Sequence, residues 1–149
     1  MLSSKAKYGL KAMVHLAGRA AEGSVLIADI AEAERIPKKF LDAILLELKN
    51  HGLLVSKKGK GGGYSLARPA NRIQVGEVLR ILDGPLAPVP CVSRTAYRRC
   101  DDCADETACA VRGVMQEVRD AMAAILDNTT IADMAKRVPR AEPVLMYDI

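Results

Sequence analysis

Residues 36–67 read IPKKFLDAILLELKNHGLLVSKKGKGGGYSLA, and this stretch decides the fold. Pro37 starts a helix at a position where its missing N–H does no harm. The apolar residues of this helix recur every three or four positions and predict one buried face, made of Phe40, Leu41, Ile44, Leu45 and Leu48. Two short strands, 53–56 and 64–67, then enclose a loop of lysines and glycines. The stretch therefore predicts a helix followed by a basic β-hairpin.

Two helices are expected before this stretch and one directly after it. Ser3 or Ser4 can cap a helix that runs to about residue 21, and a short helix covers about 27–33. The order helix, helix, turn, helix, hairpin is that of a winged helix-turn-helix. A fourth helix over about 75–83 returns apolar residues to the core. The fold class is therefore mainly α, with a two-stranded wing.

Charge is distributed unevenly along the 149 residues. Residues 1–68 carry 12 lysines and arginines against 6 acidic residues, whereas residues 69–149 carry 10 against 12. This asymmetry indicates a polyanionic partner for the N-terminal half, although a solvated lysine surface would give the same count. We expect this partner to be double-stranded DNA.

The third helix and the wing hold the candidate DNA contacts. In a helix-turn-helix the N-terminal end of the recognition helix enters the major groove. Lys38 and Lys39 can hold phosphate or guanine there, and Asp42 can accept from cytosine N4 or, alternatively, pair with a lysine on the helix surface. In the wing, lysines supply charge and glycines let the backbone approach the sugar-phosphate track; these residues are Lys57, Lys58, Lys60, Gly61, Gly62 and Gly63.

The C-terminal half predicts an oligomerisation element. The longest expected helix spans about 107–126, and its apolar residues form a stripe with too little remaining chain to cover it. We expect the same helix of a second subunit to cover the stripe, and hence a homodimer on a two-fold operator; packing onto its own N-terminal domain is the alternative. The predicted domains are 1–84, with the helix-turn-helix at about 27–51 and the wing at 53–67, and 85–149, which ends in a loose tail.

All four cysteines, Cys91, Cys100, Cys103 and Cys109, lie in a charged loop at 91–109, within the second predicted domain. Without a signal peptide or an apolar run near the length of a membrane span, the chain is expected in the cytoplasm, where thiols stay reduced. Four thiolates suit a 2Fe–2S or 4Fe–4S cluster and also a tetrahedral zinc, and nearby arginines would also suit a thiol redox switch.

The chain resembles the IscR/NsrR-type family of iron–sulfur-binding winged helix-turn-helix regulators. The resemblance rests on residues 4–12, Ile36–Leu41, the wing Gly61–Leu66 and the cysteine loop, which occur in the family's order over roughly 1–135. It implies a dimeric transcription factor that contacts DNA through its first helix, its recognition helix and the wing. By position the first-helix contacts are Ser3, Ser4, Lys5 and Lys7, and Tyr64 closes the wing motif.

The cysteine loop follows the family pattern in part. Cluster-binding members have three cysteines, and Cys103 and Cys109 keep the usual gap of five residues. The fourth ligand is a histidine in some members, where this chain has Arg112, and an acidic residue of the first helix in others, where it has Lys7 and Tyr8, so the resemblance leaves Cys100 to supply a fourth thiolate. The resemblance implies a cluster, with 2Fe–2S favoured over 4Fe–4S, that controls operator affinity.

Other classes of function fit the sequence less well. The phosphate-loop order of nucleotide-binding proteins is absent, and only two histidines exist to act as general bases, so an enzyme with a small-molecule substrate is not expected. An iron–sulfur redox protein without DNA binding, and a winged-helix module that binds protein, are the remaining alternatives. Salt-dependent DNA binding would separate the regulator from both.

Overall fold

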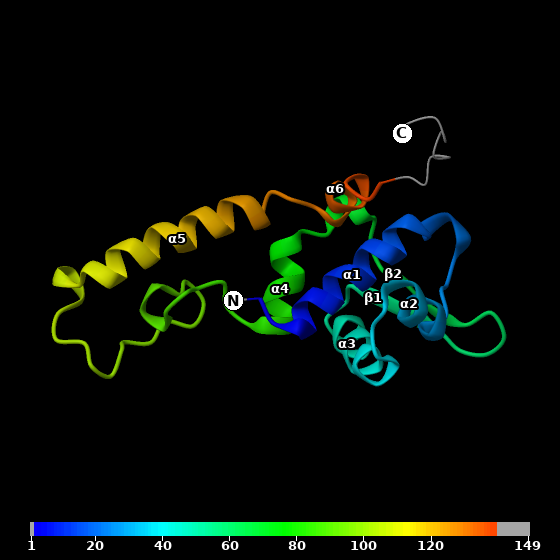
Figure 1. The fold of residues 1–149 in the computed structure, drawn as a ribbon, viewed down its shortest axis with the longest axis horizontal. Helices are drawn as coiled ribbons and strands as arrows, with labels where there is room; N and C mark the ends of the chain where they lie inside the picture. The colour runs from blue at the N-terminus through cyan, green and yellow to red at the C-terminus, as the bar shows by residue number, and fades with distance from the viewer. Residues whose placement is uncertain (1, 140–149) are drawn as a thin grey trace, which may run out of the picture.

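The computed structural model describes residues 2–139 and is mainly helical, as the sequence predicts (Figure 1). The described helices and strands are α1 (Ser4–Gly18), α2 (Ile27–Glu34), α3 (Lys38–Asn50), β1 (Leu54–Lys57), β2 (Gly63–Leu66), α4 (Val75–Asp83), α5 (Ala110–Leu126) and α6 (Ile131–Lys136). Single 3₁₀ turns lie at Ala20–Glu22, Ala70–Arg72, Pro90–Val92 and Glu106–Ala108. The tail expected at the C-terminus lies largely outside the described residues.

A helical body surrounds α1. This helix packs against α2, α3, α4 and α6, and its inner face supplies Ala6, Leu10, Ala12, Met13 and Leu16 to the core. The α2–α3 corner turns at Arg35, the one non-glycine residue with positive φ among those described, and Ile36 beside it is buried. β1 and β2 pair antiparallel, with Leu54 opposite Leu66, and form the predicted wing.

The chain returns to this body after α5. Thr130 caps α6 with a capping box, in which its side chain accepts from the Asp133 N–H at 3.1 Å and Asp133 accepts from the Thr130 N–H at 2.9 Å. The Ile131 N–H donates to the Ile73 carbonyl at 2.9 Å, and Ile131 is fully buried. Residues 4–83 and 131–136 therefore share one core, and together they constitute the body of the protein.

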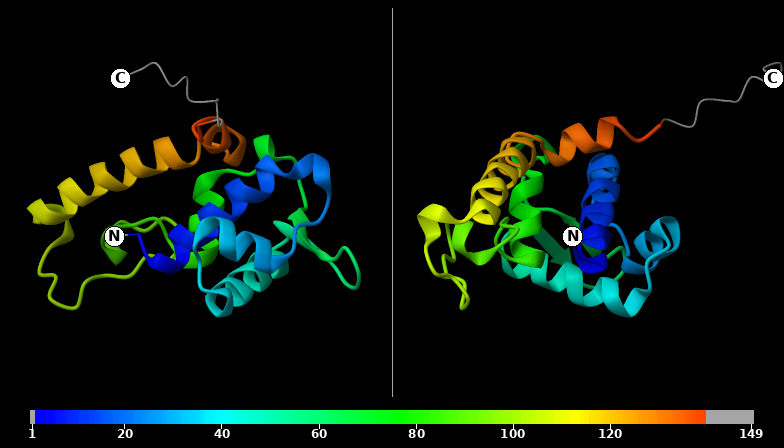
Figure 2. Two further views of the ribbon diagram at one scale, coloured as in Figure 1. Left: turned by 45° about the vertical axis from the view of Figure 1, so that its right-hand side comes forward. Right: turned by 60° about the vertical axis from the view of Figure 1, so that its left-hand side comes forward.

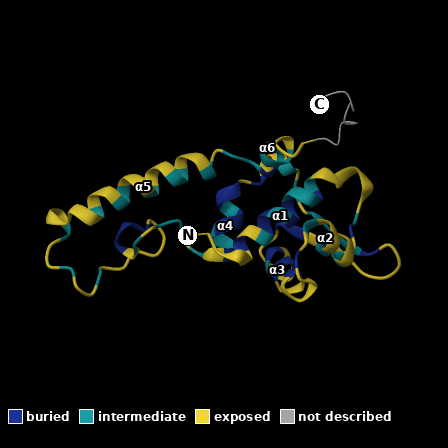
Figure 3. Cartoon of the chain, viewed as in Figure 1, coloured by how far each residue is buried: buried dark blue, intermediate teal, exposed yellow. Residues whose placement is uncertain are grey.

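Residues 85–126 form an arm that projects from the body (Figures 1 and 2). It contains the cysteine loop, residues 91–109, followed by α5. Within the arm only Cys91, Val92 and Ser93 are buried, and α5 has no buried residue (Figure 3). Among the described residues no helix is long and apolar enough to cross a membrane.

One predicted core position is wrong. The sequence pattern places Phe40 on the buried face of α3, but its side chain is 60% exposed. The other four residues of that face, Leu41, Ile44, Leu45 and Leu48, are buried. The side chains of these four residues point toward the core side of the helix. At 100° per residue, the Phe40 side chain points about a quarter-turn away from the centre of that side.

Candidate nucleic-acid interface and cysteine loop

The first turn of α3 presents its charged residues to solvent. Lys38, Lys39 and Asp42 are exposed, while the opposite side of the helix is fixed in the core. Lys38 Nζ lies 4.0 Å from Asp42 Oδ2, which is the surface pairing that the sequence allows as the alternative role of Asp42. A pair this exposed is weak, so both groups remain available to a ligand.

The wing lies on the Asp42 side of α3. The pKa of the Tyr64 hydroxyl is raised, first by burial and second by the negative charge of Asp42, so this carboxylate lies close to the base of the wing. Tyr64 also pairs with Val25, its N–H donating to the Val25 carbonyl at 2.9 Å and its carbonyl accepting from the Val25 N–H at 2.8 Å. This bridge fixes the wing beside α2 and α3. Lys57, Lys58 and Lys60 of the hairpin are exposed.

The three glycines of the wing have different structural roles. Gly61 is exposed, and a Cβ there would meet nothing within 4 Å. A Cβ on Gly62 would lie 2.3 Å from the Lys57 carbonyl oxygen, and one on Gly63, where φ is +142°, would lie 2.1 Å from the Val25 carbonyl oxygen. Gly62 and Gly63 are therefore required by the packing of the hairpin itself, before any approach to DNA is considered.

The start of α1 holds the remaining predicted DNA contacts. Ser4 and Lys7 are exposed. The Ser3 hydroxyl accepts from the Ala6 N–H at 3.0 Å as the helix cap, and it also donates to Asp83 of α4. Lys5 Nζ lies 2.7 Å from Glu47 of α3. Ser3 and Lys5 thus have partners within the body, and Lys5 ties α1 to the recognition helix.

The structure brings the four cysteines only partly together. Cys91 is buried in the Pro90–Val92 turn, and hydrogen bonding to its thiol is the main cause that raises the pKa of Cys100. The Cys103 N–H donates to the Cys100 carbonyl at 3.1 Å. Cys109 is exposed at the start of α5, where its Sγ accepts from the Arg112 N–H at 3.4 Å.

Thiolates are the donors that an iron–sulfur cluster or a zinc site uses, so the residue types fit. Their arrangement is open: within residues 2–139, no three His, Cys, Asp or Glu side chains are grouped to hold a metal ion. Completing a site from all four cysteines would require the loop between Cys91 and Cys109 to close.

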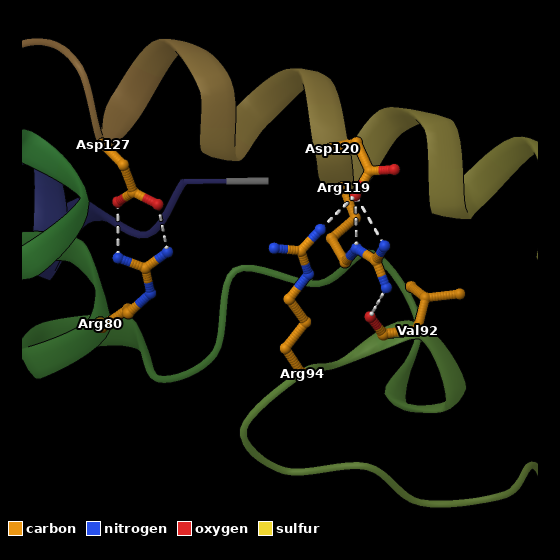
Figure 4. Close-up of polar contacts among 6 residues, drawn as sticks. All are labelled: Arg80, Val92, Arg94, Arg119, Asp120 and Asp127. Atoms are coloured by element: carbon orange, nitrogen blue, oxygen red, sulfur yellow. Dashed lines mark hydrogen bonds and ion pairs between the residues drawn. The ribbon is translucent and has the colours of Figure 1, made fainter.

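Arginines hold segments of the arm together and join the end of α5 to α4, as Figure 4 shows. Arg80 of α4 binds Asp127 with two hydrogen bonds, Nη1 to Oδ1 at 2.6 Å and Nη2 to Oδ2 at 2.8 Å, and this bond lowers the pKa of Asp127 although partial burial opposes the shift. The Arg119 guanidinium, largely buried, donates to the Val92 carbonyl at 2.7 Å and to Asp120 at 2.6 Å. Arg94 reaches the same Asp120 carboxylate at 3.1 Å.

These contacts join the turn that holds Cys91 to α5 and join the end of α5 to α4. Sequence reasoning missed them, because no spacing connects Arg80 with Asp127 or Arg119 with Val92. The available signal was limited to opposite charges far apart along the chain.

Comparison with known proteins identifies the architecture. A family model described as Rrf2, an iron-dependent transcriptional regulator, matches residues 2–137. The chain belongs to the Rrf2 family. The family resemblance noted from the sequence is thereby confirmed, and this Rrf2 protein is a helix-turn-helix transcriptional regulator of a DNA-binding family.

Individual relatives agree over most of their length. An Rrf2-like HTH-type transcriptional regulator of Rhodobacter capsulatus is 43% identical over 137 residues, covering 90% of this chain and 91% of the relative. The solved structure of CymR, the global cysteine regulator of B. subtilis, superposes with a TM-score of 0.78 at 31% identity and covers 93% of this chain and 98% of CymR. The solved structure of T. potens IscR superposes with a TM-score of 0.75 at 29% identity, and the match covers 99% of this chain and 96% of IscR. The winged-helix fold class is confirmed by both structures.

Proposed function

We propose that this Rrf2 protein is a homodimer that binds a two-fold DNA operator through α3 and the wing, and that its cysteine loop controls operator affinity. The observation that carries the DNA-binding part is the geometry of α3 and the wing. A helix anchored in the core presents Lys38 and Lys39 to solvent, and the hairpin that carries the exposed lysines of the wing packs against the same helix through β1. Cations at these positions suit the phosphates that flank a major groove.

The unpartnered stripe of α5 supports the homodimer. Val111, Val114, Val118 and Ile125 are all exposed along one side of the helix. The contacts of α5 are with the Pro90–Val92 turn and with α4, and they leave these four side chains exposed to solvent. A second α5 would bury them by the packing used in two-helix interfaces.

The cysteine loop supports control of this dimer. Cys91 and Val92 are adjacent in one buried turn, and Arg119 of α5 holds the Val92 carbonyl. A change at Cys91 is therefore transmitted to α5, and Arg80 continues the path into α4 of the body. A state that favours one arrangement of the arm would bias DNA affinity by linkage.

We infer that an iron–sulfur cluster is the group that Cys91, Cys100, Cys103 and Cys109 would hold, since all four offer thiolates. The group would supply sensitivity to iron supply, oxidants or nitric oxide. The influence of the Cys91 thiol on the pKa of Cys100 places the two groups near each other and favours a second candidate, a thiol switch. In that case the two thiols would lose two protons and two electrons to an oxidant such as hydrogen peroxide, which is reduced to water, and form a disulfide.

DNA binding is tested by titrating labelled duplex DNA at several salt concentrations. The logarithm of affinity should fall linearly with the logarithm of salt, and replacing Lys57, Lys58 and Lys60 with Ala should reduce the slope by about 0.9 for each phosphate that the wing no longer neutralises. A matched variant, Lys136→Ala with Arg137→Ala, removes exposed cations from the end of α6 and should leave the slope unchanged. A slope that the wing variant does not alter would exclude the wing from the interface.

The cofactor is tested on protein prepared without oxygen. Broad visible absorption with matching iron and sulfide per subunit supports the cluster, and Cys100→Ala should then reduce both. Colourless protein with stoichiometric zinc overturns the cluster and assigns a zinc site. The thiol switch is supported if the protein is free of metal and peroxide consumes two thiols per chain. In that case peroxide should not consume this pair of thiols in the Cys91→Ser variant.

A further inference from the structure

An exposed apolar strip runs along the outer side of α3. Phe40, the single phenylalanine of the chain, is 60% exposed and Leu46 is 49% exposed, with the exposed Ala43 between them. Residues three apart are neighbours on a helix, so Phe40, Ala43 and Leu46 form one continuous surface, the apolar strip. Exposing a phenylalanine and a leucine here gives no stability to the isolated fold.

The surroundings of the apolar strip suit a polyanion. Lys38 and Lys39 precede it on the same exposed end of α3, and Asn50 continues its outer side. Of the two acidic residues of α3, Glu47 pairs with Lys5 at 2.7 Å, and Asp42 lies 4.0 Å from Lys38. A duplex placed against this side of α3 would meet apolar side chains flanked by cations, with the charge of Glu47 paired to Lys5.

We propose that the apolar strip, through Phe40 above all, makes this protein select operators by the C5-methyl groups of thymine in the major groove. Thymine alone among the four bases presents a methyl group there, and apolar side chains, phenylalanine included, are the groups that contact it. The proposal rests on the DNA-binding function proposed above and adds the base that α3 reads. Asp42 remains the group suited to a cytosine amino group, so the two parts of α3 would read different bases.

The test removes only the methyl groups from the DNA. An operator is first selected with the wild-type protein from a random pool of duplexes and is then prepared with deoxyuridine in place of every thymidine. This exchange keeps all hydrogen-bonding groups. Wild-type protein should bind the deoxyuridine duplex more weakly, by about fourfold for each methyl group contacted.

Variants then assign the loss to the strip. Phe40→Ala should bind the two duplexes with nearly equal affinity, and Leu46→Ala should lose part of the preference. Val138→Ala removes a comparably exposed apolar side chain, 55% exposed, beyond the end of α6 and should keep the full preference. Because Phe40 lies outside the core, its variant should retain the wild-type circular dichroism and unfolding midpoint.

The outcomes separate the two proposals. Equal wild-type affinity for both duplexes, or an undiminished preference in Phe40→Ala, would overturn thymine recognition while DNA binding stands. If no duplex is selected and no salt-dependent binding is found, the proposed function fails and thymine recognition fails with it.

Discussion

The body and the arm of this protein obtain their conformations in opposite ways. In the body, helices that are distant in sequence bury one another, and side chains such as Met13, Leu45 and Ile131 have no exposed surface. In the arm, burial is confined to the turn at residues 91–93, and the seventeen residues of α5 bury none of their side chains fully. The body is held by apolar packing, whereas the arm is held mainly by arginine hydrogen bonds.

This difference assigns different roles to the two regions. A packed core tolerates little displacement, so it positions α3 and the wing rigidly for DNA. A few polar contacts near the surface contribute little stability each, so the arm responds to whatever binds its thiols or covers α5. The region with the smallest core of its own is therefore the region suited to sensing.

The largest effect is expected from a core truncation in the body. Leu45→Ala removes a fully buried side chain of α3 and should lower the free energy of unfolding by about 2–5 kcal/mol. Leu46→Ala, the next residue on the same helix, should change it by less than about 0.5 kcal/mol because Leu46 is half exposed. Urea unfolding followed by circular dichroism measures both. Equal losses would contradict the orientation of α3.

In the arm, the corresponding change should break association and spare the fold. Val114→Asp places a charge in the exposed stripe of α5 and should raise the dimer dissociation constant about a hundredfold, or ~2.8 kcal/mol. Gln116→Asp introduces the same residue on the opposite side of the helix and should have little effect. Sedimentation over a range of concentrations measures the constant. A wild-type protein that stays monomeric would refute the α5 interface.

A smaller loss of stability is expected from a substitution at Gly63, where the wing packs against Val25. Gly63→Ala should destabilise the protein by about 1–3 kcal/mol, because φ is positive there and the new Cβ would collide with the Val25 carbonyl. Gly61→Ala also has a positive φ but meets no neighbouring atom, so it is the matched control for the collision. Thermal unfolding compares the two variants. A Gly61→Ala loss as large as that of Gly63→Ala would mean that backbone strain alone, without the contact to Val25, accounts for the effect.

The smallest loss of stability is expected at the Arg80–Asp127 ion pair, which joins α4 to the residue that follows α5. Arg80 lowers the pKa of Asp127 in the folded protein, so the stability gained is complete above the ordinary carboxyl pKa of roughly 4 and is lost as pH falls through the lowered value. Asp127→Asn should cost about 0.5–1 kcal/mol at neutral pH, since the pair is partly exposed, and should cost less in acid.

Unfolding of Asp127→Asn at pH 7 and at acid pH measures this difference. Asp101→Asn breaks the far more exposed pair with Arg98, whose closest atoms are 3.7 Å apart, and should leave the free energy of unfolding unchanged at both pH values. A cost for Asp127→Asn that is the same at both pH values would contradict the ion-pair origin.

Most of the body could be predicted from the sequence. Val75–Asp83 forms α4 with the predicted bounds, and each strand of the wing is displaced by one residue from its predicted bounds. These features depend on near neighbours in the chain, through helical periodicity, capping and turn residues, and a single sequence contains that information. The exposure of the candidate lysines is predictable too, because the outward direction of a lysine on an amphipathic helix follows from the same period.

The failures occurred where position depends on contacts between distant segments. Phe40 fits a helical pattern as well as Leu41 does, and only the directions from which α1 and α4 pack against α3 leave it exposed. The spacing of the cysteines indicates thiol chemistry but could not show that Cys91 would be buried beside Cys100 while Cys109 caps α5.

The sequence by itself determined the local elements, the charge of the N-terminal half and the thiol character of the loop, because each is a property of residues close together in the chain. Only the tertiary structure decided which residues those elements bury, why Gly63 must be glycine, how Arg80 joins the end of α5 to α4, and how Arg119 joins α5 to the Cys91 turn. Those features arise where segments tens of residues apart meet, and the energy of such a contact depends on a geometry that no single segment contains.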